Sequence, residues 1–462
     1  MTDIVCVSPI DGRLVARRVP ASATHIASTV ERAKAAQRVW RETSLAERAA
    51  LCREAVDAML AMEAEIVPEL ALQMGRPVRY GAGELRGFAE RARAMIDIAD
   101  EALADVDPGP KEGFRRFIRR EPLGVVFTVA PWNYPYLTAV NSIVPALMAG
   151  NAVILKHAAQ TILVGERFQR AFDAAGFPEG LFQTLVLTHD DTLRLIGSGE
   201  LDQVCFTGSV EAGRAIERAA AGTFTGVGLE LGGKDPAYVR ADCNFDHTVE
   251  NVVDGAFFNS GQSCCGIERV YVAASIHDRF VEAATALTKQ YVLASPLDPA
   301  TTLGPMARAS LAGVVREQTA QALAQGARGT LDAKLFAADR PGTPWLAPQI
   351  LVDVDHSMEV MTEESFGPVV GIMKVESDEQ AIELMNDSRY GLTASIWTGD
   401  AEAAERIGER IDTGTVFLNR ADYLDPALAW TGVKDTGRGA TLSRVGYEAL
   451  TRPKSFHLRM KV

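Results

Sequence analysis

The sequence predicts an α/β protein with two successive α/β domains and a projecting β-ribbon. Short apolar strands alternate with helices from Gly124 onward, and a second alternating series begins after Gly232-Gly233. Such alternation indicates parallel sheets with helices on both faces. A chain of 462 residues is also too long for one ordinary core. We therefore expect two α/β domains with a cleft between them.

The first hundred residues are expected to be mainly helical. Ser44-Leu45-Ala46-Glu47 is a capping box that opens an amphipathic run toward Met62. Gly75 is a candidate stop for a later helix.

The first alternating series has five expected strands and three expected helices. The strands are Val125–Ala130, Ala152–Lys156, Phe182–Leu187, Val204–Phe206 and Val227–Leu231. The helices lie near 161–175, 190–197 and 210–220. In the second series, strands are expected near 268–273, 368–374, 394–398 and 414–418, and helices near 276–290, 307–324, 377–386 and 400–410.

Residues 106–121 interrupt the first series. Val-Asp-Pro-Gly-Pro-Lys-Glu-Gly is followed by the alternating Phe-Arg-Arg-Phe-Ile-Arg-Arg, which predicts a β-ribbon projecting from the body. We interpret Arg115–Arg120 as a solvated or intersubunit strand, and an anion site is the alternative.

Composition excludes several classes of function. The net charge of -13 disfavours nucleic acid as a partner, because phosphate binding requires a basic surface. We expect no membrane association and a cytoplasmic location, since no apolar stretch could span a bilayer and the first residues lack a secretion signal. The six cysteines and seven histidines are scattered without ligand spacing, so we expect no metal site.

Three segments carry groups suited to attack on a carbonyl. Cys264 follows Phe-Phe-Asn-Ser-Gly-Gln-Ser, Glu230 heads Glu-Leu-Gly-Gly-Lys, and Asn133 lies in Pro-Trp-Asn-Tyr-Pro. They offer a thiol nucleophile, a carboxylate that activates water, and an amide that holds an oxyanion. The alternatives are a buried inert thiol for Cys264 and a turn-capping carboxylate for Glu230.

Two further features suit a dinucleotide. Phe206-Thr207-Gly208-Ser209 ends a strand and opens a helix with Gly213 in its first turn, so backbone N–H groups and the helix dipole can receive a diphosphate. The alternative is a tight packing turn. Lys156 ends a strand at the edge where open sheets bind ligands, and a solvated lysine is its alternative.

Taken together, these segments resemble the aldehyde dehydrogenase superfamily, of the NAD(P)-dependent, non-acylating, hydrolytic type. The resemblance runs from Ser8-Pro9 to Pro453-Lys454-Ser455-Phe456. It implies a Rossmann-like cofactor domain (1–105 and 122–232), a catalytic domain (233–442) and an oligomerisation arm (106–121 and 443–462). It also implies a homodimer or homotetramer.

The resemblance implies a role for each site residue. Cys264, rather than Cys265, is the nucleophile, Glu230 is the general base that releases the acid, and Asn133 completes the oxyanion hole. The expected cofactor-binding residues are Trp132, Lys156, Gly208, Ser209, Gly213, Glu364 and Phe366. NAD-preferring members carry a glutamate where this chain has Ala159, so NADP as well as NAD is an expected cofactor.

The chain departs from the family near its C-terminus, where Ala440-Thr441 replaces the usual Arg-Glu. That change puts in doubt any proton path through the glutamate. One alternative is that the chain is a non-catalytic structural relative of the family, as occurs among lens crystallins. Another is that it is an acylating, coenzyme-A-dependent dehydrogenase. Retention of Glu230 argues against the acylating type, whose members tend to lack this residue.

The expected substrate pocket is aromatic. Its residues are Tyr134, Asn141, Phe258 and Trp430, with Tyr423 and Leu424 near the mouth. Succinate semialdehyde members often carry arginines at the positions of Asn141 and Phe258, which bind the distal carboxylate of the substrate. Arg420 could replace these arginines, but Asp422 lies two residues away and would offset its charge. We therefore expect an uncharged aliphatic or aromatic aldehyde first, ω-aminoaldehydes next and succinate semialdehyde last.

Overall fold

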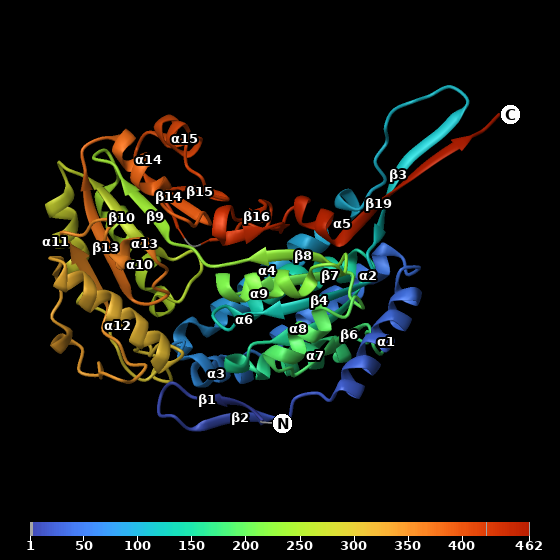
Figure 1. Ribbon diagram of the computed structural model, residues 1–462, viewed down its shortest axis with the longest axis horizontal. Coiled ribbons are helices and arrows are strands. Elements are labelled where there is room, and N and C mark those ends of the chain that lie inside the picture. The colour runs from blue at the N-terminus through green and yellow to red at the C-terminus, as the bar shows by residue number, and fades with distance from the viewer. Residues whose placement is uncertain (1–2, 422, 462) are drawn as a thin grey trace.

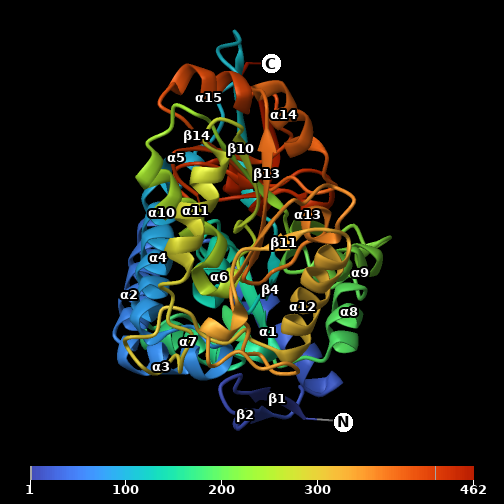
Figure 2. The ribbon, with the colours of Figure 1, turned by 90° about the vertical axis from the view of Figure 1, so that its left-hand side faces the viewer.

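The computed structural model describes residues 3–421 and 423–461, which form two α/β units and a projecting ribbon (Figure 1). A six-stranded sheet forms the centre of one unit and a seven-stranded sheet the centre of the other. Helices pack on the sheets, as Figure 2 shows from a second side. The predicted fold class, two α/β parts with Rossmann-like parallel sheets, is confirmed.

The N-terminal hundred residues form a hairpin followed by helices. These elements are β1 (Ile4–Val7), β2 (Leu14–Arg18), α1 (Ala23–Trp40), α2 (Leu45–Leu60), α3 (Glu63–Met74), α4 (Val78–Asp97) and α5 (Ala99–Ala102). The Ser44 side chain accepts a hydrogen bond from the N–H of Glu47, as the capping box predicts. Gly75, with φ of 85°, ends α3 in the left-handed conformation that glycine favours.

The six-stranded sheet has the order β17-β8-β7-β4-β5-β6 and is parallel except for β17. Its strands are β4 (Val125–Ala130), β5 (Ala152–His157), β6 (Phe182–Thr184), β7 (Gln203–Thr207), β8 (Gly226–Glu230) and β17 (Gly437–Arg438). The accompanying helices are α6 (Pro135–Met148), α7 (Leu163–Ala174), α8 (His189–Ile196) and α9 (Val210–Ala220). Every residue of β4 and β5 is buried, as expected for central strands covered on both faces.

The seven-stranded sheet has the order β11-β12-β13-β10-β9-β14-β15 and is parallel except for β11. Its strands are β9 (Asp235–Val239), β10 (Ile267–Ala273), β11 (Arg328–Gly329), β12 (Gln349–Val352), β13 (Val369–Val375), β14 (Thr393–Trp397) and β15 (Thr415–Leu418). The helices are α10 (Phe245–Phe257), α11 (His277–Thr288), α12 (Ala309–Ala324), α13 (Glu359–Thr362), α14 (Asp378–Asn386) and α15 (Ala401–Gly408). One face packs on α10 and α11 and the other on α12 to α15.

Seven of these elements were not predicted: α6, α10, α13, β9, β11, β12 and β17. Strand β9 reads Asp-Pro-Ala-Tyr-Val, and aspartate and proline are both rare inside strands. Burial between β10 and β14 makes it a strand regardless. The strand expected at Phe182–Leu187 ends at Thr184.

The ribbon consists of β3 (Phe114–Pro122) and the C-terminal strand β19 (Thr451–Arg459), paired antiparallel along their whole length. Phe117 and Phe456 stack across it, with ring centroids 4.4 Å apart. A second short pair joins β16 (Trp430–Thr431) to β18 (Ala440–Thr441). Single 3-10 turns lie at η1 (Ala159–Thr161), η2 (Phe258–Gly261), η3 (Ala333–Leu335), η4 (Lys434–Thr436) and η5 (Val445–Leu450). None of the helices in the described ranges is both long and apolar enough for a membrane crossing.

Candidate active site

The carboxyl ends of four parallel strands bring most of the predicted residues to one edge of the six-stranded sheet. Trp132, Asn133 and Tyr134 follow β4, and Lys156 lies at the end of β5. Gly208 and Ser209 follow β7, and Glu230 is the last residue of β8. Open α/β sheets bind ligands at this edge.

A cavity of about 240 Å³ lies where this edge meets the second unit. Cys264 and Glu230 both line it. The four predicted substrate residues line it as well: Tyr134, Asn141, Phe258 and Trp430. The structure therefore gathers the proposed nucleophile, the proposed base and the expected pocket around one space.

The loop before Cys264 is rigidly held. Asn259, Ser260 and Gly261 all have left-handed backbone conformations, with φ of 54°, 57° and 70°. A Cβ on Gly261 would lie 2.2 Å from the carbonyl oxygen of Gly367, so only glycine fits. The Gln262 side chain donates to the Asn259 carbonyl (2.9 Å) and accepts from the Ala307 N–H (2.8 Å). These bonds fix the approach of the chain to the nucleophile.

Asn133 is buried and tied to the nucleophile loop through its backbone. Its carbonyl oxygen accepts hydrogen bonds from Arg76 Nη2 (2.5 Å) and from Asn259 Nδ2 (3.3 Å). Asn259 also accepts a bond from Arg76 Nε (3.2 Å) through its side-chain oxygen. The Asn133 segment is thus joined to the Cys264 loop directly by Asn259 and indirectly through Arg76.

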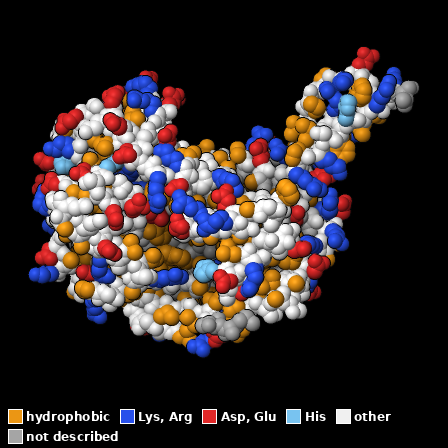
Figure 3. All heavy atoms as spheres, viewed as in Figure 1, with side chains coloured by type: hydrophobic (Ala, Val, Ile, Leu, Met, Phe, Trp, Pro, Cys, Tyr) orange, Lys and Arg blue, Asp and Glu red, His pale blue; other side chains and the backbone are white. Residues whose placement is uncertain are grey.

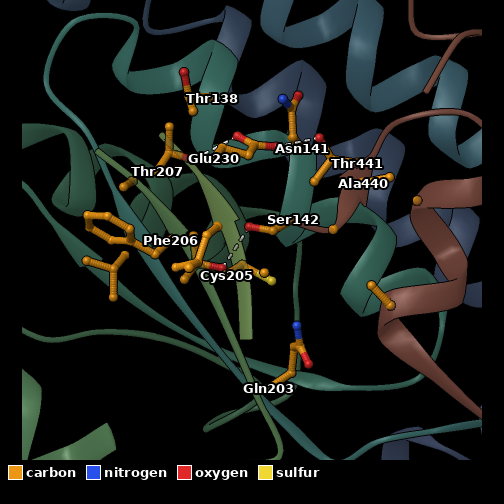
Figure 4. A pocket seen from close by; sticks show the side chains of 18 of the residues that line it. Thr138, Asn141, Ser142, Gln203, Cys205, Phe206, Thr207, Glu230, Ala440 and Thr441 are labelled. Carbon is orange, nitrogen blue, oxygen red and sulfur yellow. Dashed lines mark hydrogen bonds between the residues drawn. The ribbon is translucent and has the colours of Figure 1, made fainter. Parts of the chain in front are cut away.

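Two threonine hydroxyls hold the Glu230 carboxylate (Figure 4). Thr207 donates to Oε2 (2.8 Å) and Thr441 donates to Oε1 (2.5 Å). Burial raises the pKa of Glu230, and the bonds from Thr441 and Thr207 and the charge of Arg91 oppose that rise. Thr441, noted in the sequence as a departure from the family, thus contacts the proposed base directly.

A second, smaller cavity of about 40 Å³ also borders Glu230, Thr207 and Thr441. Figure 4 shows its polar side chains, among them Ser142 and Gln203. The Thr128 and Ser142 hydroxyls lie 2.9 Å apart within this lining. Glu230 therefore lies between the two cavities: it lines the larger one together with Cys264, and the smaller one together with several hydroxyl-bearing side chains.

The glycines of the β7–α9 turn permit close packing. A Cβ on Gly208 would lie 2.5 Å from the Phe206 ring, and one on Gly213 would lie 2.6 Å from Leu231. Ser209 caps α9, its side chain accepting from the N–H of Ala212 (3.4 Å). The exposed N-terminus of α9 has the backbone N–H groups and dipole that suit a diphosphate.

The Glu364–Phe366 segment is positioned by a buried ion pair. Lys234 donates to Glu268 (2.6 Å), and the Glu268 carboxylate accepts from the backbone N–H groups of Ser365 (2.7 Å) and Phe366 (2.8 Å). Glu364 accepts from the N–H of Gly233 (3.1 Å). Burial, and then the charge of Glu268, raise the pKa of Glu364.

Trp132 and Phe366 meet edge to face across the junction between the units, with ring centroids 5.6 Å apart. They lie near the same sheet edge as the β7–α9 turn. Glu364 itself approaches Gly232, where a Cβ would lie 2.2 Å from its carboxylate. The predicted cofactor residues thus come from both units.

Of the two residues predicted near the pocket mouth, Tyr423 and Leu424, one lines the cavity and the other does not. Leu424 lines the cavity, but Tyr423 is not among the described residues that line it, and its hydroxyl donates to Glu90 (2.7 Å). The Arg420 guanidinium stacks over the Tyr423 ring, 4.0 Å from its centroid, and also lies outside the lining. Asp422 falls outside the described residues.

Sequence reasoning missed the charged residues that α3–α4 and β10 supply. Arg76, Glu84 and Arg91 line the cavity, and Glu268 supports the Glu364 segment. Arg76 stands between Gly75 and Pro77, and Glu84 directly follows Gly83, but neither segment was recognised as part of the site. A further signal was Lys234 at the end of Glu-Leu-Gly-Gly-Lys, because a buried lysine requires an acidic partner.

Comparisons with known proteins give a consistent picture. Residues 1–456 match the aldehyde dehydrogenase family. A succinate-semialdehyde dehydrogenase (NADP(+)) of Mycobacterium avium is 33% identical over 456 residues, 98% of this chain and 96% of the relative. An aldehyde dehydrogenase of Paenarthrobacter nicotinovorans is 34% identical over 438 residues, 93% and 94% of the two chains.

Solved structures agree with this match. The succinic semialdehyde dehydrogenase of Streptococcus pyogenes, in complex with NADP+, superimposes with a TM-score of 0.94 at 28% identity. That similarity covers 99% of this chain and 100% of the other. The matched residues include both sheets, the cavity and the ribbon strand β3. The chain belongs to the aldehyde dehydrogenase family.

Proposed function

We propose that this enzyme oxidises an aldehyde to a carboxylic acid with NAD(P)+ as the oxidant. The observation that carries the proposal is that Cys264 and Glu230 line one cavity beside the β7–α9 turn. A thiol and a carboxylate around one space suit covalent capture of a carbonyl followed by hydrolysis.

In this mechanism the Cys264 thiolate attacks the aldehyde carbon. The Asn133 side-chain amide and the backbone N–H of Cys264 stabilise the oxyanion that forms. A bound nicotinamide would supply the hydride acceptor, and loss of hydride from the thiohemiacetal carbon would leave a thioester on Cys264. Glu230 then takes a proton from a water that attacks the thioester, and the acid is released.

The same residues support binding of a dinucleotide across the sheet edge. The turn with Gly208, Ser209 and Gly213 would receive the diphosphate, and Lys156 would contact the ribose. Glu364, Phe366 and Trp132 would hold the nicotinamide end. Glu268 maintains the Glu364–Phe366 segment by its two backbone bonds.

Tolerance of NADP is supported by a group of cations at Lys156. Burial, and then the charge of Arg308, lower the pKa of Lys156 to about 8. Arg308 donates to Gln160 (2.9 Å), and no carboxylate of the described chain lies within 4.0 Å of Lys156 or Arg308. With Ala159 in place of a glutamate, a 2'-phosphate meets attraction rather than repulsion. Ala159→Glu should raise the NAD/NADP ratio of kcat/KM, and an unchanged ratio would argue that this position does not face the ribose.

We also propose assembly into at least a homodimer. Leu458 in β19 is exposed, as are Val106 and Met460 next to the ribbon. Figure 3 shows hydrophobic and basic side chains together on this projecting arm. At the far end of the molecule, the edge strand β15 exposes Val416 and Leu418. Open strand edges with apolar side chains are normally covered by a partner. A monomeric mass in light scattering at micromolar concentration would contradict this assembly.

A spectrophotometric screen tests the activity. About twenty aldehydes are incubated with NAD+ and with NADP+, and reduced cofactor is followed. Turnover with any aldehyde and formation of the free acid support the proposal. Formation of a thioester only with added coenzyme A would instead indicate the acylating type.

A further inference from the structure

We propose that Arg91 binds a carboxylate at the far end of the substrate, so that the preferred substrates are ω-oxo acids. This inference rests on the proposed function, since it names the substrate class of the same cavity. It concerns a residue of α4 that carries no motif in the sequence.

Arg91 is anchored on one side only. Its Nη1 donates to the Leu137 carbonyl (2.8 Å) and to Asn141 Oδ1 (3.4 Å), one turn apart on α6. Nε and Nη2 make no hydrogen bond with any described residue, although the side chain lines the cavity. Two donors of a rigid fork are thus available to a ligand, in the geometry that suits a carboxylate.

The charge of Arg91 has no bonded counter-ion among the described residues. Across residues 3–421 and 423–461, no carboxylate lies within 4.0 Å of it. The two nearby acids bond elsewhere: Glu84 is paired with Arg76, and Glu230 accepts from two threonines. Burial lowers the pKa of Arg91, while the charges of Glu84, Cys265, Glu230 and Cys264 raise it.

The position of Arg91 explains how this pocket differs from the pattern expected from the family. Succinate semialdehyde members often place an arginine at the position of Asn141, and here the Asn141 side chain accepts a bond from Arg91 instead. The guanidinium therefore enters the same region from α4 rather than α6. The sequence-based prediction ranked carboxylate-tailed aldehydes last because Asn141 and Phe258 replace the arginines of succinate semialdehyde members and because Asp422 lies two residues from Arg420; it did not consider Arg91.

The reacting end lies within electrostatic reach of this group. Arg91 and Cys264 line the same cavity, and the charge of Cys264 is one of those that oppose the lowering of the Arg91 pKa by burial. An ω-oxo acid would place its aldehyde on Cys264 and its carboxylate on Nε and Nη2. Phe258, Leu424 and Trp430 line the same cavity and would cover the methylene groups.

The test compares aldehydes of equal length that differ in the tail. Succinate semialdehyde, butanal and 4-aminobutanal form one set, and glutarate semialdehyde and pentanal form another. For the wild type, kcat/KM with the carboxylate tail should exceed that with the uncharged tail by about 10- to 100-fold. Arg91→Met should reduce this ratio to about one, chiefly through KM, and Arg91→Lys should retain part of it because a point charge replaces the fork.

Arg86→Met is the matched control, because Arg86 is exposed on the same helix and does not line the cavity. It should leave the ratio unchanged. Equal loss with both tails in Arg91→Met would indicate a structural role and overturn the proposal. A wild-type preference for butanal or 4-aminobutanal would also overturn it.

A binding measurement separates this inference from the proposed function. Calorimetric titration with succinate should detect binding to the wild type and to Arg86→Met, and at least about tenfold weaker binding to Arg91→Met. Equal affinity of all three proteins for succinate would contradict a carboxylate site at Arg91, even if the enzyme oxidises aldehydes. Absence of turnover with every aldehyde and both cofactors, with succinate still bound, would reject the dehydrogenase function alone.

Discussion

The substrate cavity has a charged wall and an apolar wall. The charged wall comes from the α3–α4 connection and α4, which supply Arg76, Glu84 and Arg91. The apolar wall comes from the second unit and the segment after β15, with Phe258, Leu392 and Trp430. The apolar wall limits the access of water to Cys264. The charged wall contains buried ionic groups, each of which needs a hydrogen-bond or ion-pair partner.

Within the charged wall, the two arginines differ in how many partners they have. Arg76 bonds Glu84, Asn133 and Asn259, so its donors all serve the protein. Among residues 3–421 and 423–461, Arg91 forms hydrogen bonds through Nη1 alone. A fully bonded buried cation is a scaffold, and a half-bonded one in a cavity is available for recognition.

The largest effect is expected from Cys264→Ala, which removes the reacting atom and leaves both walls in place. Turnover should fall by at least about a thousandfold, since no other nucleophile replaces the thiolate. Cofactor binding, measured by fluorescence titration, should persist. Cys265→Ala is the matched control and should keep most of its turnover, and the reverse pattern would shift the nucleophile by one residue.

Glu230→Gln should separate the two halves of the reaction. A burst of about one reduced cofactor per active site should remain, and steady turnover should fall by about 10²- to 10⁴-fold, because the amide cannot accept the proton of water. Stopped-flow absorbance followed by steady-state assay measures both phases. Steady turnover at the wild-type rate would remove Glu230 from the hydrolytic step.

Arg76→Met tests the scaffold role of the other arginine. It leaves the Glu84 carboxylate buried without its counter-ion, so the free energy of unfolding should fall by about 3–5 kcal/mol. Glu84 also accepts from the N–H groups of Tyr136 (2.9 Å) and Leu137 (3.0 Å) at the start of α6. Urea denaturation measures the loss.

Two comparisons sharpen that measurement. Arg79→Met, at an exposed position near the start of α4, should change stability little. Arg76→Met combined with Glu84→Gln should recover part of the loss, because the amide oxygen still caps α6 without a buried charge. Equal stability of Arg76→Met and Arg79→Met would show that the pair is not a scaffold.

Most residues that could be predicted from the sequence lie in short glycine-bearing motifs. Strand-to-helix alternation predicted that the strands before Gly208 and Glu230 share one edge, whereas Cys264 lies in the loop before β10 of the other sheet. The fold class followed from the same alternation. Local composition marked these turns as candidates, and the resemblance to the aldehyde dehydrogenase superfamily then implied their roles.

The charged wall could not be predicted in this way. Arg91 lies on an amphipathic helix among exposed charges such as Arg86 and Glu90, and its sequence context matches that of a solvated arginine. Only the packing of α4 on α6 brings it to the cavity. Thr441 was noticed as a departure from the family, but its bond to Glu230 depends on the pairing of β18 with β16.

The smallest effect is expected from Thr441→Val, which removes one of the two hydroxyl donors to Glu230. A hydrogen bond to the ionised form lowers a carboxyl pKa, so its loss should raise the pKa of Glu230 further above the ordinary value. The base must be ionised to act, and the acid limb of steady turnover should therefore move to higher pH. On that limb the rate should fall by about tenfold, while the burst at high pH stays near the wild-type amplitude. Thr441→Ser keeps the hydroxyl and should keep the wild-type profile. If Thr441→Val and Thr441→Ser give the same pH profile, the hydroxyl does not control the ionisation of the base, and Thr207 alone would account for the position of the carboxylate.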